Sequence, residues 1–241
     1  MGDYSFLNIP DSCFIGSTIY KKLFYENANL SSSDKYLFSD IIDKIVWLYC
    51  LKPETINVQA YMDEVREYPE IEVIEVIVNK DYGLNRIAEI IMRTIPYPML
   101  LIFKLEDKIR FYMAHQRTNQ SDSSKNTIEE FVSTDWLESD SALFDKLDIK
   151  QMRFINFYTL YSDIVDAISI YKLSTIMPTD DNITGTEARE LSAKIEEIEQ
   201  EITSLRAKLK KESQFNRKME LNIEIKRLEQ SKNKLLGGDN E

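Results

Sequence analysis

Six large aliphatic side chains near the C-terminus recur at alternating spacings of four and three residues, and this repeat constrains the fold more than any other feature. They are Leu191, Ile195, Ile198, Ile202, Leu205 and Leu209. The spacing is that of a heptad repeat, which places all six on one face of an α-helix. Thr184, followed three residues later by Glu187, predicts a capping box at the start of this helix.

The repeat weakens further along the chain. Continuing the register passes through the polar residues Glu212 and Asn216, reaches Met219 and Ile223, and fails at Lys226. A second register, which starts at Leu221, overlaps this last part. Two geometries fit: one helix of about 50 residues, roughly 75 Å long, or a hairpin that folds back near residues 211–216. Because neither glycine nor proline marks a turn there, the sequence favours the continuous helix.

The apolar face of such a helix needs a cover, since most helical stability comes from tertiary packing of that face. Each fully buried Ile or Leu contributes about 1.5–3 kcal/mol, so six exposed side chains would forgo on the order of 10 kcal/mol. That is comparable to the net stability of a whole domain. We therefore predict that the six residues form an association seam, covered by a second copy, another protein, the other arm of a hairpin, or the rest of the chain.

The charge pattern of this segment narrows the choice of partner. Its first part is acidic, and its middle part is basic through Arg206, Lys208, Lys210, Lys211, Arg217 and Lys218. A parallel dimer would set like charges side by side, whereas an antiparallel dimer centred near residue 203 would set acid against base. Two alternatives stay open: a solvated face with pairs inside the helix, or nucleic-acid contact through Lys208, Lys210, Lys211, Arg217 and Lys218.

Residues 1–176 are predicted to form one α+β (mixed α/β) globular head with a small sheet and packed helices. A polar linker, residues 177–186, leads to the long helical, coiled-coil segment over residues 187–236, and residues 237–241 are predicted to be disordered. Residues 1–180 hold 18 basic and 28 acidic side chains, and the whole chain has a net charge of −11. Such an acidic chain argues against a protein dedicated to coating nucleic acid.

Hydrophobic periodicity predicts the elements of the head. In chain order they are a helix over residues 31–53, a strand over 70–80, a helix over 84–96, two strands within 98–116 around a turn at Glu106–Asp107, an exposed loop over 117–126, a strand over 127–137 and a helix over 149–173. This order suits a small mixed sheet that carries helices.

The sequence contains no motif for a cofactor or for covalent catalysis. None of its six glycines lies in a phosphate-binding loop, which excludes a P-loop or a dinucleotide-binding fingerprint. His115 is the single histidine and has no cysteine or second histidine nearby, so we predict a structural or solvent-facing residue there and no metal site. Cys13 and Cys50 are predicted to be buried free thiols. We predict no cofactor, and a non-enzyme is better supported than an enzyme.

A metal-dependent nuclease is the sharpest enzymatic alternative. Such sites gather carboxylates and a lysine on adjacent strands to hold Mg²⁺ and position water. Glu72 and Glu75 lie on one predicted strand, and Lys108 follows two acidic residues at a predicted hairpin. Turn residues of this kind are common without a catalytic role, so these three are weak candidates.

The sequence also bears on where the protein acts. The N-terminus lacks the basic region and apolar run of a signal peptide. No uninterrupted apolar run approaches the ~18–20 residues that span a bilayer. We therefore expect a cytoplasmic protein without a membrane partner.

Five stretches together resemble a known family: "IYKKLFYENA", "IVWLYCLKPETINV", "EIEVIEVIV", "RIAEIIMRTIPYPMLLIF" and "KKESQFNRKMELNIEIKRL". This ordered set is similar to a bacterial and archaeal protein family of unknown function, over nearly the whole chain. Its members are often encoded beside DNA methyltransferases and superfamily-two helicases of restriction-modification or antiphage loci. The resemblance implies an accessory or adaptor subunit of a DNA-defence assembly, and it implies no catalytic residue.

The leading hypothesis is accordingly an interaction protein. Its head would dock one component, and its helical segment would bind itself, as an antiparallel dimer, or a helicase or methyltransferase subunit. The alternative is a metal-dependent nuclease or a nucleic-acid-binding subunit of such a system.

Overall fold

The computed structural model describes residues 3–118, 126–180 and 182–237. The chain divides into two compact units, Met1–Ile168, which we call the head, and Ser169–Glu241, which we call the tail. The predicted disordered segment, residues 237–241, lies outside the described residues except for Gly237. Most of the predicted loop over residues 117–126 also lies outside them, and its two ends belong to strands.

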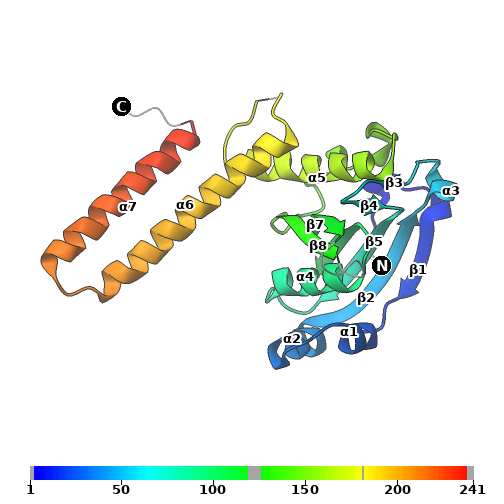
Figure 1. Cartoon of the computed structure of the whole chain (residues 1–241), viewed down its shortest axis with the longest axis horizontal. Coiled ribbons are helices and arrows are strands. Elements are labelled where there is room, and N and C mark those ends of the chain that lie inside the picture. The colour runs from blue at the N-terminus through cyan, green and yellow to red at the C-terminus, as the bar shows by residue number, and fades with distance from the viewer. Residues whose placement is uncertain (1–2, 119–125, 181, 238–241) are drawn as a thin grey trace. The chain divides into compact units, whose positions relative to one another are not determined.

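The head is built on a six-stranded sheet with the order β1-β2-β5-β6-β7-β8 (Figure 1). The strands are β1 (Phe14–Thr18), β2 (Ile42–Leu51), β5 (Ile71–Val78), β6 (Met99–Leu105), β7 (Lys108–Thr118) and β8 (Asn126–Ser133). β5 and β6 run parallel, and the other neighbours are antiparallel. β3 (Tyr61–Met62) and β4 (Glu67–Tyr68) form a separate two-stranded ribbon.

The helices of the head are short except for two. They are α1 (Lys22–Asn27), α2 (Ser32–Tyr36), α3 (Pro53–Ile56), α4 (Leu84–Thr94) and α5 (Phe157–Ser174), the last of which continues into the tail. The mixed α/β class is therefore confirmed. The predicted strand at β5, the helix at α4 and the strand pair around Glu106 are also present. Glu106 has a φ of 55°, which suits a tight turn. The last predicted helix begins at Phe157 rather than at Ile149.

The helix predicted over residues 31–53 is wrong in its second half. α2 and a π-helical turn, Leu37–Ile41, occupy the first part, and the chain then enters β2 at Ile42. β2 lies between β1 and β5 and is buried along most of its length. A short run that is apolar all round fits a buried helix and a buried strand equally well, and here pairing with two neighbouring strands decides the outcome.

One face of the sheet is closed by α4. Ile87 and Ile91 of this helix are fully buried in a cluster that also contains Ile74 and Val76 of β5 and Phe103 of β6. Strand residues two apart share a face, so the even-numbered residues of β5 point towards α4.

Helix α5 is attached to two strands by a buried tyrosine. The Tyr161 hydroxyl lies 3.0 Å from the carbonyl oxygen of Met99 and 2.9 Å from that of Ala114, on β6 and β7 respectively. The side chain is fully buried, and burial raises the pKa of its hydroxyl.

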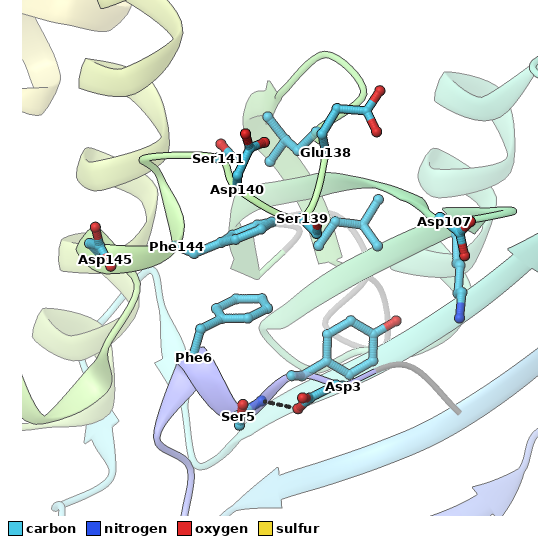
Figure 2. A pocket seen from close by; sticks show the side chains of 14 residues that line it. Asp3, Ser5, Phe6, Asp107, Glu138, Ser139, Asp140, Ser141, Phe144 and Asp145 are labelled. Atoms are coloured by element: carbon cyan, nitrogen blue, oxygen red, sulfur yellow. Dashed lines mark hydrogen bonds between the residues drawn. The ribbon is translucent and has the colours of Figure 1, made fainter.

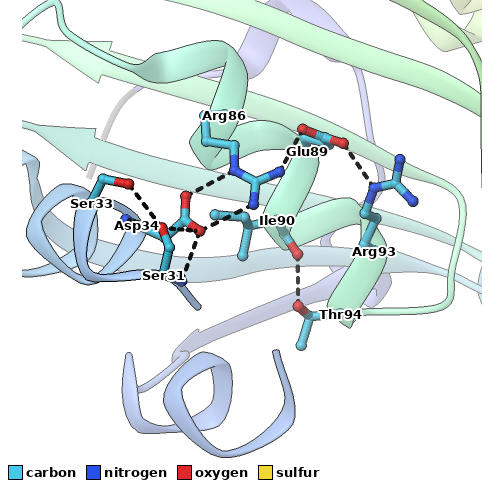
Figure 3. A network of polar contacts seen from close by, with 8 residues as sticks. All are labelled: Ser31, Ser33, Asp34, Arg86, Glu89, Ile90, Arg93 and Thr94. Atoms are coloured by element: carbon cyan, nitrogen blue, oxygen red, sulfur yellow. Dashed lines mark hydrogen bonds and ion pairs between the residues drawn. The ribbon is translucent and has the colours of Figure 1, made fainter. Parts of the chain in front are cut away.

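A polar network ties α4 to α2 (Figure 3). Ser31 caps α2 by accepting from the Asp34 amide, and the guanidinium of Arg86 on α4 donates to both Asp34 oxygens at 2.8 and 3.1 Å. The Arg86 hydrogen bond holds the pKa of the buried Asp34 carboxyl well below its usual range. This contribution to stability is present above the unfolded-state pKa of about 3.9 and is lost as the pH falls through the lower folded-state value.

The tail is a helical hairpin, so the continuous helix favoured by the sequence is wrong. α6 (Gly185–Lys211) is followed by its C-cap residue Glu212, and α7 (Phe215–Leu235) begins three residues after Glu212. The Glu212 carboxylate accepts from the amides of Ser213 and Gln214 at 2.7 and 2.9 Å. These bonds satisfy the amides of the two residues that connect the helices, and so support a turn that contains neither glycine nor proline. The predicted capping box at Thr184 and Glu187 is present.

The hairpin covers its own seam. Ile202 and Leu205 of α6 are buried against Ile225 of α7, and Ile198, Leu209, Leu221 and Leu228 pack around them. Nearer the other end, Ile195 is buried with Ala188 and with Leu173, from the last part of α5. Ion pairs join Arg206 to Glu229 and Glu199 to Lys232, in the order expected of antiparallel helices.

Two isoleucines on α7 offer a matched test of this packing. Ile225 is 7% exposed and Ile223 is 64% exposed. We expect Ile225→Ala to destabilise the hairpin by about 2–5 kcal/mol because it opens a cavity in the core, and Ile223→Ala to change its stability by less than about 0.5 kcal/mol. Amide hydrogen exchange across α6 and α7 measures both effects. Equal protection losses in the two variants would contradict this packing.

Candidate functional site

The three nuclease candidates lie apart from one another in the head. Glu72 and Glu75 are three residues apart on β5, whose pairing with β6 shows no bulge, so they point to opposite faces of the sheet. Glu75 accepts a hydrogen bond of 2.6 Å from the Tyr4 hydroxyl. Lys108 starts β7, and its ammonium group pairs with Glu138 at 2.7 Å. The structure therefore does not bring these three side chains together as a metal-binding group.

Glu72 instead belongs to a buried polar cluster between β2 and β5. The Trp47 indole donates to one of its oxygens at 2.5 Å, and the Cys50 thiol donates to the other at 3.4 Å. Cys50 and Glu72 are direct cross-strand partners, and each is nearly inaccessible to solvent. Burial raises the pKa of Glu72 to about 7, against the hydrogen bonds from Trp47 and Cys50, which lower it.

The same cluster contains donors that suit a divalent metal ion. The Cys50 sulfur and carboxylate oxygens of Glu70 and Glu72 lie within 4.8 Å of one another. Thiolate and carboxylate ligands can bind a transition metal. In this structure, however, the thiol donates to Glu72, and Lys52 approaches Glu70 at 3.7 Å. The sequence did not reveal this group, because residues 42–51 were assigned to a helix and Cys50 was not expected to lie opposite β5.

The raised pKa of Glu72 makes the stability of the head depend on pH. Its folded-state pKa of about 7 exceeds the unfolded-state value of about 4.3. Between these two pH values the folded state therefore binds more protons than the unfolded state, and the stability of the head falls as the pH rises. We expect Glu72→Gln to remove this dependence, which is worth on the order of 3 kcal/mol in full. Chemical denaturation from about pH 5 to about pH 8 measures it.

The control for this experiment is Glu64→Gln, which changes an exposed carboxylate in the same unit. It should leave the pH profile as in the unmodified protein. If Glu72→Gln and Glu64→Gln give the same profile, then Glu72 does not titrate in this range.

The single histidine is part of a buried aromatic group. Its Nδ1 lies 2.8 Å from the Tyr68 hydroxyl, and the rings of Tyr158 and Tyr161 are also close to it. His115 is 8% exposed. This environment fits a structural histidine, which is one of the two alternatives predicted, and not a solvent-facing one. Both cysteines are free and buried, as predicted.

A pocket of about 750 Å³ opens on the head (Figure 2). The stacked rings of Phe6 and Phe144, 4.3 Å apart, form one wall. Its carboxylates come from Asp3, Asp107, Glu138, Asp140 and Asp145, and among the described residues that line it only Lys104 is basic. Such walls repel phosphates and other anions, which disfavours a nucleotide as its ligand.

The basic residues singled out in the sequence gather at the turn of the hairpin. Lys208, Lys210 and Lys211 end α6, and Arg217 and Lys218 lie in the first turn of α7. Arg217 approaches Glu220 at 3.9 Å, and the four lysines make no ion pair with any residue that the structure describes. Residues 206–227, which we call the tip, hold eight basic and three acidic side chains, a net charge of +5.

Three large apolar side chains are exposed on α7. Phe215, Met219 and Ile223 are 74%, 49% and 64% exposed. Spacings of four residues place them on one face of the helix, and we call them the stripe. The face that packs on α6 carries Leu221, Ile225 and Leu228 instead. Extending the register of the seam past Leu209 placed Met219 and Ile223 on the same helix face as the seam, because no turn was expected there.

The architecture defines the class of protein: a mixed α/β unit followed by a unit that is mainly a helical hairpin. The chain belongs to the family described as "Domain of unknown function (DUF4391)", whose profile matches residues 7–231 and thus includes both units. No curated protein and no solved structure matches the chain. None of the helices in the described ranges is long and apolar enough to cross a membrane.

Proposed function

We propose that this protein is an adaptor that acts by binding other proteins, with the hairpin of α6 and α7 as its main interaction element. The observation that carries this proposal is the stripe. Scattered apolar side chains are normal on protein surfaces, but a row of them on one helix face is typical of a binding surface. The hairpin core is already closed by other residues, so the stripe is not needed for folding.

The arrangement of the head supports a role without catalysis. Glu72 and Glu75 point to opposite faces of β5, and both are engaged in hydrogen bonds. Lys108, the first residue of β7, forms an ion pair with the exposed side chain of Glu138. These positions serve packing and solubility better than they serve a shared metal ion.

The resemblance stated for the sequence supports a finer proposal. A family often encoded beside helicases and DNA methyltransferases suits an accessory subunit of a DNA-defence or restriction-modification assembly. In this proposal the head binds one component of the assembly, and the hairpin supplies a second contact.

The test uses a tagged full-length chain in its native host. We expect the unmodified protein to retain specific host proteins, and the triple variant Phe215→Ser, Met219→Ser, Ile223→Ser to lose at least one of them, because it removes the apolar contact and spares the hairpin core. Affinity purification followed by quantitative mass spectrometry measures retention.

The matched control replaces two exposed apolar residues of the head, Tyr20→Ser and Met62→Ser, each 76% exposed before substitution. It should retain the same proteins as the unmodified chain. Equal retention by all three proteins would mean that the hairpin is not the interaction element.

Nucleic-acid binding is a second candidate, and the tip favours it. Five cations lie at one end of the hairpin, four of them without an ion pair to any described residue, on an otherwise acidic chain. Clustered cations of this kind support phosphate binding as a proposal. Contact with five phosphates of duplex DNA would give a log–log salt slope of about −4.5. Fluorescence anisotropy with a labelled duplex at several salt concentrations measures it.

Two paired variants sharpen this measurement. Lys210→Gln with Lys211→Gln should reduce the magnitude of the slope by about 2, whereas Lys35→Gln with Lys80→Gln, on the head, should leave it unchanged. Binding that does not respond to salt excludes the candidate.

A further inference from the structure

We infer that Cys50, Glu70 and Glu72 form a binding site for one divalent transition-metal ion of the zinc class. The site lies in the head, where the end of β2 meets the start of β5. The adaptor role and this site are independent of each other, because the metal ligands belong to the head and the stripe belongs to α7.

Strand pairing places the three donor groups together. Cys50 and Glu72 are direct cross-strand partners on β2 and β5, and the side chains of such a pair stand next to each other on one face of the sheet. Glu70 lies two residues before Glu72, so the alternation along an extended chain turns both carboxylates to that face. The Cys50 sulfur and one oxygen of each carboxylate lie within 4.8 Å of one another. Two paired strands therefore hold most of the ligand set in place.

The separation of the donor atoms suits a small ion. In a tetrahedral zinc site, bonds of about 2.3 Å to sulfur and about 2.0 Å to oxygen place these two ligands about 3.5 Å apart. The Cys50 sulfur lies 3.4 Å from an oxygen of Glu72. The thiol donates its proton to that oxygen here, and a metal ion would replace this proton and bind both atoms. The Glu70 side chain is 20% exposed and comes directly before β5, so it can close on the ion.

The charges at this position favour a cation. Two ionised carboxylates this close together repel each other, which costs free energy unless a positive charge neutralises them. Trp47 and Cys50, which donate to Glu72, are both uncharged. Lys52 supplies one positive charge beside Glu70, but its ammonium group is 3.7 Å away and its side chain is 43% exposed. A divalent ion between the two carboxylates would neutralise both.

The mixture of sulfur and oxygen ligands indicates which ions fit. Mg²⁺ and Ca²⁺ are bound by oxygen ligands, whereas Zn²⁺ accepts both a thiolate and a carboxylate. Three protein ligands leave the fourth tetrahedral position to water. Trp47 donates at 2.5 Å to the Glu72 oxygen that Cys50 does not contact, and so fixes the orientation of this carboxylate. The sequence prediction against a metal site concerned His115, which is not one of these ligands.

The experiment uses the untagged full-length chain, stripped of metal with a chelator and kept under reducing conditions. Calorimetry measures the binding of Zn²⁺, and absorption spectroscopy measures the binding of Co²⁺. We expect one Zn²⁺ to bind per chain. Co²⁺ should give a charge-transfer band from thiolate to metal, and added Zn²⁺ should abolish the band by displacing Co²⁺.

The two cysteines provide a matched pair of variants. Cys50→Ser should lose both the Co²⁺ band and the binding of Zn²⁺, whereas Cys13→Ser should keep both. Each thiol is 1% exposed before substitution, and Cys13 belongs to no metal-binding group among the described residues. Circular dichroism shows whether each variant is folded.

A second pair of variants keeps the test decisive if Cys50→Ser does not fold. Glu70→Gln should weaken Zn²⁺ binding by at least about tenfold, because loss of a direct ligand costs no less than loss of an outer-shell partner. Its partly exposed side chain makes this variant compatible with folding. Glu64→Gln, which changes an exposed carboxylate of the head, should bind Zn²⁺ as the unmodified chain does.

The outcomes are distinct from those of the adaptor experiment. Absence of Zn²⁺ binding, or weak binding of several ions without a Co²⁺ charge-transfer band, overturns the metal site. A band that survives in a folded Cys50→Ser variant, or equal Zn²⁺ affinity in Glu70→Gln and Glu64→Gln, also overturns it. Each of these results leaves the adaptor role to be decided by the stripe variant. One Zn²⁺ per chain, with a band that requires Cys50 and an affinity that requires Glu70, supports the site.

Discussion

The antiparallel pairing of β2 with β5 is the contact on which the head depends. It places an apolar strand in the interior of the sheet, where both of its faces can be buried against other elements. It also sets Cys50 and Trp47 beside Glu72, so that a buried carboxyl is held by two donors from one neighbouring strand. The raised pKa of Glu72 follows from the same burial. Because α4 packs on the face that Ile74 and Val76 share, the position of that helix also depends on this pairing.

The tail obeys a related constraint. A row of aliphatic side chains must be covered, and the turn at Glu212 brings α7 back to cover the row within the same chain. Once the seam is closed, the outer faces of the two helices become the surfaces available to partners. One carries the stripe with its lysines, and the other carries small and acidic side chains. The adaptor proposal rests on this division of inner and outer faces.

Local patterns predicted several elements correctly. The β-branched run at β5, the amphipathic pattern at α4, the acidic turn at Glu106 and the capping box at Thr184 each carry a signal within a few residues. The six seam residues were also recognised as a face that needs a cover. The candidate surface was predicted only in part: the basic residues were identified, but Phe215, Met219 and Ile223 were not recognised as an exposed row.

What the sequence by itself determined is therefore the mixed α/β class, the helical character of the C-terminal region, and the charge contrast along it. These properties depend on composition and on spacings within a few turns or strands. The tertiary structure alone decided that residues 42–51 form a strand and that the helix turns back at Glu212. In both places the local pattern suits two structures, and burial against segments distant in the sequence, β5 for one and the first arm of the hairpin for the other, selects between them.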